Sequence, residues 1–443
     1  MHTRKYLIKT YGCQMNIHES EKIAGILKEM NFCKEAESEE DADIIVFNTC
    51  CIRDGAEQKI FSHIGALKKL KKKNPKLIIC VTGCLAQADG KIDDIEIKFP
   101  FVDIAIGTYN LSYFGDYLMR FLEDGIPTYD VWPEDLRLHK KVTPLRSQGT
   151  NAWVNISYGC DNYCTYCIVP YVRGRERSRS VQDIVDEVRC LAEGGYRYIT
   201  LLGQNVNSYG NDIDDPDVNF ATLLKKVSEI EGDFKIRFMT NHPKDLTDDV
   251  IEEVATNDKI CKVIHLPVQS GNNRILKLMN RKYTREKYLE IIDKIRKRIP
   301  NCTITTDIIV GFPTETDEEY MDTYNLVKEV RFDGIFAFKY SKRTGTPAEK
   351  MDGQIPELVK RQRVNDLLAL ERSIIRQDLR KMVRQKLDAV FDYSDAEKNE
   401  SYFKLDNNKT VTVPYSEYYN TDSFHKIKIM KAVNNRIYGL IRD

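Results

Sequence analysis

The sequence lacks several features that would assign it to a class at once. It carries no net charge, because 67 Lys and Arg residues balance 67 Asp and Glu residues. It has no run of about 18 apolar residues, roughly the least that crosses a membrane as a helix. Its first residues, MHTRKYLIKTYGC, hold neither the apolar core nor the cleavage site of a signal peptide. We therefore expect a cytoplasmic protein without membrane association, whose 12 cysteines are thiols or metal ligands rather than disulfides.

Charge is nevertheless uneven along the chain, which shows no internal repeat and no low-complexity segment. Residues 68–76, KKLKKKNPK, form a basic run, and a long polar helix expected near residues 357–386 has a basic bias. Runs of this kind are more often solvated helix faces than nucleic-acid sites. The sequence alone leaves both interpretations open.

The first third of the chain alternates strand and helix candidates. Strands are expected near residues 5–10, 44–47 and 77–81, and helices near residues 17–30 and 55–72. This order predicts an open parallel sheet wrapped by helices. The segment from about residue 130 to residue 150 is polar, holds two prolines and breaks the periodicity, so it is expected to be a linker.

A second alternation follows, with six strand candidates joined by five helices of crossover length. The strands are expected at residues 153–157, 198–202, 235–240, 262–266, 303–310 and 334–340, and the helices at residues 181–193, 221–230, 247–254, 284–298 and 317–330. This predicts a partial (β/α)6 barrel of parallel strands. The long helix then leads to about 60 residues of short strands, a small β-barrel module. We expect an α/β chain of three domains, at residues 1–130, 146–376 and 377–443.

Three cysteines are spaced as ligands of an iron-sulfur cluster. Cys160, Cys164 and Cys167 form the pattern CxxxCxxC after the first strand of the predicted barrel, where parallel barrels build their active sites. The spacing lets three thiolates bind three irons of a 4Fe-4S cluster and leaves the fourth iron open. A zinc site is disfavoured, because no fourth Cys or His lies close in sequence. Three incidental core cysteines are the alternative.

Three further cysteines each follow a predicted strand. Cys13 follows YLIKT, Cys50 follows DIIVFNT and Cys84 follows LIICVTG. The carboxyl ends of parallel strands share one edge of a sheet, so these thiols are expected to lie close together as a second cluster site. Three unrelated loop cysteines are the alternative. The neighbouring Cys51 points away from Cys50 on an extended segment, so at most one of this pair is expected to be a ligand.

The motifs YGCQMNIHES, FNTCCIR and TGCLAQ, together with CxxxCxxC, make the chain resemble the methylthiotransferases, a radical S-adenosylmethionine (SAM) family with two 4Fe-4S clusters. The resemblance covers essentially the whole length and ends in a module similar to the family's RNA-binding TRAM domain. The segments YCIVPYVRGRERSR at 166–179 and LLGQNVNSYG at 201–210 resemble the branch that acts on N6-isopentenyladenosine at position 37 of tRNA. The resemblance thus implies an enzyme that forms 2-methylthio-N6-isopentenyladenosine.

The same resemblance implies a role for each cysteine set. Cys160, Cys164 and Cys167 would hold the cluster that cleaves SAM. The auxiliary cluster, which carries the sulfur, would be held by Cys13, Cys50 and Cys84. One SAM would methylate a sulfur on the auxiliary cluster, and a second would yield the radical that removes hydrogen from C2 of the adenine. The implied partners are a tRNA anticodon stem-loop and an electron donor such as flavodoxin or ferredoxin, with the enzyme acting as a monomer.

Six other polar residues are candidate contacts of SAM or of the adenosine: Gln204, His265, Gln269, Arg173, Arg175 and Arg177. The first three lie at or just after predicted barrel strands, where a structural hydrogen bond is the alternative role. The three arginines and Arg179 occupy alternate positions, which would place their guanidinium groups on one side of an extended segment. Such a row suits phosphates or a carboxylate, and a solvated charge run is the alternative.

Rival functions stay open at the level of sequence. A related enzyme methylthiolates threonylcarbamoyladenosine in tRNA and shares both cysteine sets. A non-radical iron-sulfur carrier or RNA-binding protein is a second rival, although such a carrier needs no barrel. The tail is more acidic than most TRAM modules, and its aromatic residues either stack on unpaired bases or form the core of the module. These aromatic residues are Tyr402, Phe403, Tyr415, Tyr418 and Tyr419.

Overall fold

The computed structural model describes residues 4–51, 56–133, 142–146, 149–407, 409–419 and 424–441. The chain divides into two compact units. Unit 1 comprises Met1–Gln204, Asn211–Asp214 and Ser341–Glu349, and unit 2 comprises Asn205–Gly210, Asp215–Tyr340 and Lys350–Asp443. Within the described ranges, no helix is both long and apolar enough to cross a membrane. The division into three domains at residues 1–130, 146–376 and 377–443 stays a prediction.

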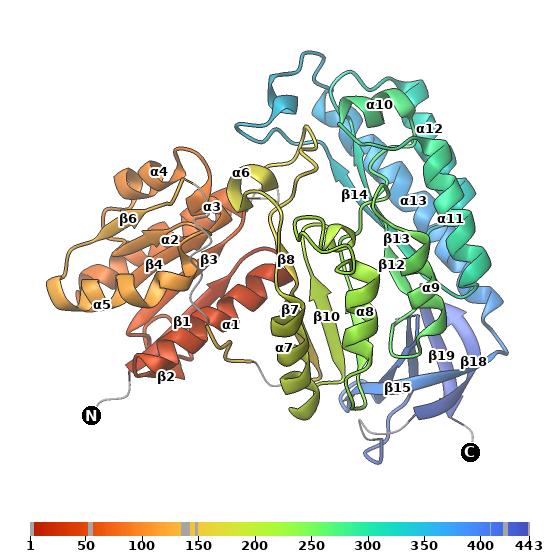
Figure 1. The fold of residues 1–443 in the computed structure, drawn as a ribbon, viewed down its shortest axis with the longest axis horizontal. Coiled ribbons are helices and arrows are strands. Elements are labelled where there is room, and N and C mark those ends of the chain that lie inside the picture. Colours follow the sequence, from red (N-terminus) through yellow and green to blue (C-terminus); the bar gives the residue numbers. More distant parts are fainter. Residues whose placement is uncertain are drawn as a thin grey trace. The chain divides into compact units, whose positions relative to one another are not determined.

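Unit 1 begins with a parallel sheet in the order β2-β1-β3-β4-β5-β6 (Figure 1). Its strands are β1 (Arg4–Thr10), β2 (Phe32–Glu35), β3 (Ile44–Thr49), β4 (Ile78–Gly83), β5 (Ile104–Ile106) and β6 (Thr128–Asp130). Its helices are α1 (Gln14–Glu29), α2 (Ala56–Lys73), α3 (Cys84–Gln87), α4 (Lys91–Lys98) and α5 (Phe114–Asp124), with the 3-10 turn η1 (Leu111–Tyr113). Helices α1 and α5 pack on one face of the sheet, and α2 and α4 pack on the other. The predicted open parallel sheet is confirmed, with three strands in addition to the three predicted ones.

Apolar residues explain why these strands lie in the middle of the sheet. All residues of β3 and of β4 are buried, as expected of strands covered by helices on both faces. The three unpredicted strands have three or four residues each, too few to show a period in the sequence.

Part of the predicted linker is packed rather than free. Residues 134–141 and 147–148 lie outside the described residues, but residues 142–146 run along α1. The Leu145 amide donates to the Glu21 carbonyl at 2.8 Å, and its side chain packs against the core. The Arg146 guanidinium donates to a Glu21 carboxylate oxygen at 2.6 Å and to the Trp153 carbonyl at 2.8 Å. This stretch therefore stabilises unit 1, and its role as the connection between two domains stays a prediction.

Replacing Gly25 by alanine is expected to lower the free energy of unfolding by about 1–3 kcal/mol. A Cβ at this position of α1 would lie 2.0 Å from the Thr143 carbonyl oxygen, a backbone atom that must then move. The matched control is Gly65→Ala in α2, where the nearest atom lies at 3.5 Å. Because alanine favours a helix over glycine, the control should gain about 0.5–1 kcal/mol. Urea unfolding of both variants measures the difference, and equal effects would show that residues 142–146 do not pack here.

The remainder of unit 1 carries the first part of the predicted barrel. Strands β7 (Asn151–Asn155) and β10 (Tyr198–Leu202) pair in parallel, and β8 (Ser157–Tyr158) and β9 (Arg177–Ser178) pair antiparallel. Helix α6 (Val169–Arg173) lies between β8 and β9, and α7 (Val181–Glu193) follows β9. The Ser180 hydroxyl caps α7 by accepting from the Asp183 amide, which fixes where this helix begins.

Unit 2 continues the alternation of strands and helices. Its strands are β11 (Lys235–Phe238), β12 (Val263–His265), β13 (Thr303–Val310) and β14 (Gly334–Lys339). Strands β12, β13 and β14 pair in parallel in this order. The helices are α8 (Phe220–Ser228), α9 (Asp248–Thr256), α10 (Asn273–Leu278), α11 (Arg285–Arg298) and α12 (Asp317–Val330), with the 3-10 turn η2 (Val206–Ser208). A further 3-10 turn, η3 (Pro347–Lys350), lies almost wholly in the part of unit 1 that ends at Glu349. The predicted order of six strands joined by five helices is confirmed.

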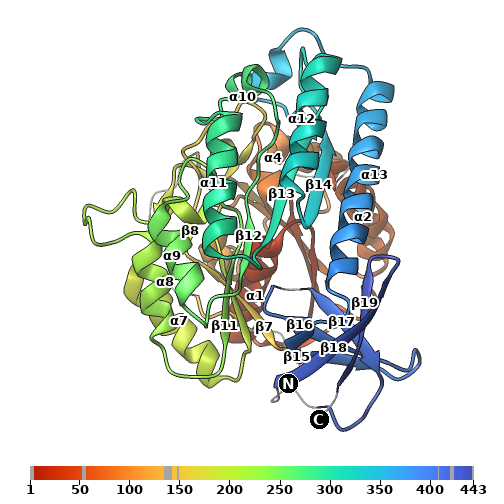
Figure 2. The same ribbon diagram turned by 90° about the vertical axis from the view of Figure 1, so that its right-hand side faces the viewer.

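A long helix leads to a closed β-barrel at the end of unit 2 (Figure 2). Helix α13 (Glu357–Lys381) precedes β15 (Lys386–Asp395), β16 (Glu400–Leu405), β17 (Thr410–Pro414), β18 (Phe424–Val433) and β19 (Arg436–Ile441). The barrel order is β15-β16-β17-β19-β18. The helix predicted to reach residue 386 ends five residues earlier, because Lys386 starts β15, which pairs with β16 and β18.

The structure divides the aromatic residues of the barrel between the two predicted roles. Phe403 is buried in the barrel core, and Tyr419 packs against that core. Tyr402 stacks on Tyr393 with ring centroids 4.5 Å apart, and Tyr393 is 53% exposed. Tyr418 is 85% exposed. Phe403 therefore belongs to the core of the barrel. Tyr393, Tyr402 and Tyr418 lie at the surface and are accessible for stacking on bases.

Candidate cluster-binding site

The predicted auxiliary set lies at one edge of the parallel sheet of unit 1. Cys13 caps the start of α1 just after β1, Cys50 directly follows β3, and Cys84 directly follows β4 as the first residue of α3. Strands β1, β3 and β4 are neighbours and run parallel, so their carboxyl ends lie together. The structure thus brings three thiols that are far apart in sequence to the same edge. Their role as cluster ligands stays a prediction.

Close packing surrounds these thiols. A Cβ on Gly12 would lie 2.7 Å from the Cys50 Cβ and 3.1 Å from its Sγ, so only glycine fits beside this thiol. Gly12 also has a φ of 123°, a backbone conformation that side chains rarely adopt. Burial raises the pKa of the Cys84 thiol to about 12, so cluster binding must displace a proton there. Across the described ranges, no group of three or more His, Cys, Asp or Glu side chains is arranged so that it could hold a metal ion.

The second predicted set lies in the loop between β8 and α6. The Cys160 amide donates to the Gly174 carbonyl at 3.1 Å, and the Cys167 amide donates to the Cys164 carbonyl at 2.9 Å. The Asn162 side-chain amide donates to the Cys160 sulfur at 3.3 Å. These bonds fold the CxxxCxxC loop into a compact turn, and three sulfur donors in one short loop suit the chemistry of a 4Fe-4S cluster.

Helix α6 joins the two cysteine sets within unit 1. Its residue Val172 and the preceding Ile168 form an apolar cluster with Cys84, and Cys51 packs against this cluster. The Thr108 hydroxyl donates to the Val172 carbonyl at 2.5 Å and holds the same helix. The CxxxCxxC loop therefore lies next to the edge of the sheet that carries the auxiliary set. Cys51 has an apolar packing role here, as predicted for the neighbour of Cys50.

Arg173, the last residue of α6, is a buried charged residue near the place where α6 packs against Cys84. Its guanidinium donates to both carboxylate oxygens of Glu19, at 2.6 and 3.2 Å, and to the Asn16 side-chain oxygen at 3.3 Å. Only 3% of its side chain is exposed. Burial opposes the charge, but the nearby Cys84 thiol and Glu19 carboxylate raise the pKa of Arg173 above its ordinary value. Its Nε is buried without a hydrogen-bond partner in the described structure.

The other predicted arginines point elsewhere. Arg175 is largely exposed and bonds Asp161 at 2.8 and 2.9 Å, and Arg177 lies over the Tyr158 ring at 5.7 Å. The expected single row of guanidinium groups is therefore wrong, because residues 169–173 form a helix and Gly174 turns the chain with a φ of 72°. Whether any of these arginines binds SAM or a phosphate stays a prediction.

Gln204 lies beside the auxiliary set in unit 1. Its amide donates to the Met15 sulfur at 3.0 Å, and the Arg173 guanidinium reaches the same sulfur, also at 3.0 Å. Met15, Asn16 and Glu19 are not among the site residues predicted from the sequence. They lie in YGCQMNIHES, and Asn16 and Glu19 are one helical turn apart, a spacing that places both on one face of α1.

His265 and Gln269 belong to unit 2. The His265 Nδ1 lies 2.9 Å from the Thr305 hydroxyl, and its Nε2 lies 3.5 Å from a carboxylate oxygen of Asp307. Gln269 is buried with a φ of 68°, and its side-chain oxygen has no partner among the described residues. His265 thus has the structural hydrogen bond that was the alternative to ligand binding. The side-chain oxygen of Gln269 has no such bond, and binding of a ligand by Gln269 stays a prediction.

Replacing Glu19 by alanine is expected to lower the free energy of unfolding by about 3–5 kcal/mol. The reason is that the Arg173 guanidinium would stay buried without its carboxylate partner. The matched control is Asp186→Ala, which removes the partner of Arg189 from an exposed ion pair and should cost about 1 kcal/mol or less. Urea unfolding under anaerobic conditions compares them. Similar small losses for the two variants would contradict the buried pair.

Two family models match the sequence. The model of the radical SAM superfamily matches residues 154–327, and that of an uncharacterized protein family, UPF0004, matches residues 5–107. A protein of Clostridium tetani named tRNA-2-methylthio-N(6)-dimethylallyladenosine synthase is 54% identical over 363 residues, which cover 82% of this chain and 80% of that protein. A protein of the same name from Clostridium perfringens is 50% identical over 376 residues, covering 85% of this chain and 84% of that protein.

Solved structures show the same fold at low sequence identity. The radical SAM methyltransferase TsrM from Kitasatospora setae, with cobalamin and a 4Fe-4S cluster bound, superposes with a TM-score of 0.57 at 11% identity. The match covers 79% of this chain and 74% of that one. The cobalamin-dependent radical SAM enzyme OxsB gives a TM-score of 0.51 at 13% identity, over 84% of this chain and 56% of that one. At these identities the likeness concerns the fold alone.

Proposed function

We propose that this chain, which belongs to the tRNA-2-methylthio-N(6)-dimethylallyladenosine synthase family of the radical SAM superfamily, converts N6-isopentenyladenosine at position 37 of tRNA to its 2-methylthio derivative. The observation that carries this proposal is the packing of α6, which follows the CxxxCxxC loop, against Cys84 of the auxiliary set. A sulfur carrier has no need to place two such sets together. An enzyme that generates a radical at one cluster and takes sulfur from another does.

The residues have distinct roles in this proposal. Cys160, Cys164 and Cys167 hold the 4Fe-4S cluster that, when bound, supplies the electron for SAM cleavage. The auxiliary cluster is held by Cys13, Cys50 and Cys84. The buried Arg173 balances the negative charge of the thiolates with its guanidinium. The apolar cluster around Cys84 excludes water, which protects a reactive intermediate from side reactions.

The partners follow from this function. The substrate is the anticodon stem-loop of tRNA, and the closed C-terminal barrel with its exposed Tyr418 and the Tyr393 and Tyr402 stack supplies aromatic surface for unpaired bases. A flavodoxin or ferredoxin donates the electron. The enzyme acts as a monomer in the cytoplasm, where tRNA is modified.

Nucleoside analysis of tRNA tests the substrate. In a strain from which the gene has been deleted, 2-methylthio-N6-isopentenyladenosine should disappear and N6-isopentenyladenosine should accumulate, and a plasmid copy of the gene should restore the methylthio form. The rival that acts on threonylcarbamoyladenosine predicts the loss of that nucleoside's methylthio derivative instead. Persistence of 2-methylthio-N6-isopentenyladenosine in the deletion strain would reject the proposal.

A further inference from the structure

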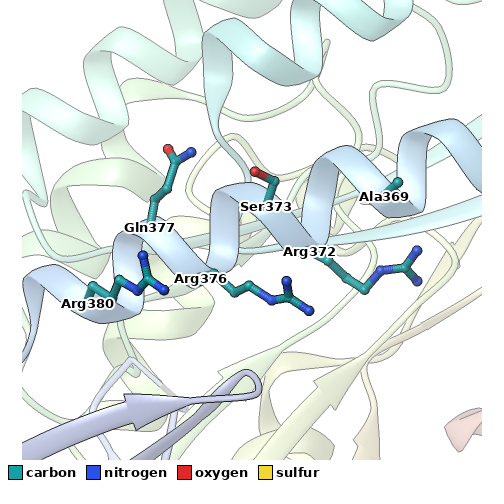
Figure 3. A pocket seen from close by; sticks show the side chains of 6 residues that line it. All are labelled: Ala369, Arg372, Ser373, Arg376, Gln377 and Arg380. Carbon is teal, nitrogen blue, oxygen red and sulfur yellow. The ribbon is translucent and has the colours of Figure 1, made fainter.

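One face of α13 carries a row of arginines. Arg372, Arg376 and Arg380 are exposed and follow one another at intervals of four residues. Together with Ala369, Ser373 and Gln377 they line a shallow pocket along the helix (Figure 3). Figure 3 shows Arg372 and Arg376 extending from the same edge of α13, away from Ser373 and Gln377. Four residues of helix advance about 6 Å, so the row presents three positive charges along about 12 Å.

Within the described ranges the side chains of these arginines have no ion pair or hydrogen bond, unlike those of Lys360, Arg363 and Lys381 in the same helix. Arg363 bonds Glu315 at 2.5 Å and Asp317 at 2.7 Å, and Lys381 bonds Asp378 at 2.7 Å. Asp378 also accepts from Arg331 at 2.8 Å, so its carboxylate is already shared by two cations.

Glu371 is the carboxylate next to the row in sequence. It is half-buried and accepts from the Ile335 amide at 2.6 Å, and its electrostatic interaction with Arg372 is weaker than the effect of its own burial. No carboxylate in the described part of the chain therefore closes an ion pair with the row.

Charge repulsion within this row opposes the formation of α13. Like charges at positions i and i+4 of a helix destabilise it by about 0.2–0.5 kcal/mol per pair. A cation in the last turn interacts favourably with the helix dipole, but this applies to Arg380 and not to Arg372, which lies more than two turns from the end. A neighbouring face of α13 is held by packing, because Ile375, Leu379 and the C-cap residue Met382 contact the core of the barrel. The arginines are thus fixed on the same unit as the barrel.

We propose that Arg372, Arg376 and Arg380 bind consecutive phosphates of the RNA backbone. This inference rests on the proposed function, since it locates where part of the tRNA backbone is held. Guanidinium groups donate two parallel hydrogen bonds to a phosphate, and contacts of this kind position a nucleic acid without reading its sequence. The row and the exposed tyrosines of the barrel both belong to unit 2, so the same unit supplies backbone and base contacts.

The test measures RNA affinity of the full chain with both clusters reconstituted, against a tRNA transcript, over a range of salt concentrations. The variant is Arg372→Gln/Arg376→Gln/Arg380→Gln. Each phosphate contact contributes about 0.7–0.9 to the slope of log K against log salt, so losing three should reduce the slope by about 2–3. At physiological salt the dissociation constant should rise about tenfold or more. The Arg372→Lys/Arg376→Lys/Arg380→Lys variant keeps the charges and should keep most of the slope.

The matched control is Lys68→Gln/Lys69→Gln/Lys72→Gln, which removes three exposed charges from α2. It should leave the slope nearly unchanged. An unchanged slope in the arginine variant, or equal losses in both variants, would overturn the proposal. SAM cleavage and iron content, measured in the same preparations, should equal those of the unaltered protein. If the unaltered protein makes no methylthio nucleoside, the proposed function fails, whereas a normal product with an unchanged slope rejects only the arginine row.

Discussion

Replacing Cys164 by alanine is expected to abolish the formation of 5′-deoxyadenosine from SAM. The assay is anaerobic cluster reconstitution, addition of dithionite and SAM, and chromatography of the products. Cys164 is one of three thiols for three irons, so its loss leaves an iron without a protein ligand. The hydrogen bond from the Cys167 amide goes to the Cys164 carbonyl, a backbone group that alanine retains. The loop should therefore keep its shape, and the effect should be chemical rather than structural.

The control for this variant is Cys190→Ala, which removes an exposed thiol from α7. It should form 5′-deoxyadenosine at the rate of the unaltered protein. Equal product from the Cys164→Ala variant and the unaltered protein would remove the radical enzyme from consideration and favour an iron-sulfur carrier. Loss of product from both variants would show a general sensitivity to cysteine replacement instead of a ligand at position 164.

Replacing Cys50 by alanine is expected to abolish auxiliary-cluster binding and methylthiolation, whereas Cys51→Ser should leave both nearly intact. Cys50 is 1% exposed at the end of β3, between the neighbouring strands that lead to Cys13 and Cys84. Cys51 packs against the apolar cluster of Cys84, Ile168 and Val172. A buried hydroxyl at that position costs about 1–3 kcal/mol of stability but removes no thiol from the edge of the sheet.

Iron content and electron paramagnetic resonance of the two variants separate these roles. The Cys50→Ala variant should hold about half the iron of the unaltered protein and still cleave SAM, because the CxxxCxxC set is complete. The Cys51→Ser variant should match the unaltered protein in iron and in methylthio nucleoside formed. A reversed pattern, with Cys51→Ser losing the cluster, would identify Cys51 as the ligand. Equal loss in both would mean that the two thiols act together.

Much of the fold could be predicted because its signals are local. The alternation of apolar strands and amphipathic helices predicted six strands that are joined by crossover helices, namely β7, β10, β11, β12, β13 and β14. It failed for β2, β5, β6, β8 and β9, which are too short to show a period, and for β15, which pairs with the following strand β16 and with the more distant β18. It also missed the packing of Thr143 and Leu145 on α1, since contacts across the chain leave no period in a polar segment.

The candidate site likewise has a part that could be predicted from the sequence and a part that could not. By itself the sequence determined which cysteines follow which strands, since strand order and the position of a residue after a strand are properties of a short segment. Only the tertiary structure decided what surrounds them. In the folded chain Arg173 is buried against Glu19 and Arg175 is exposed, although a single glycine separates these two arginines in the sequence. The physical reason is that burial and ion pairing depend on residues more than 150 positions apart, here Arg173 and Glu19, which meet only when α6 packs beside α1.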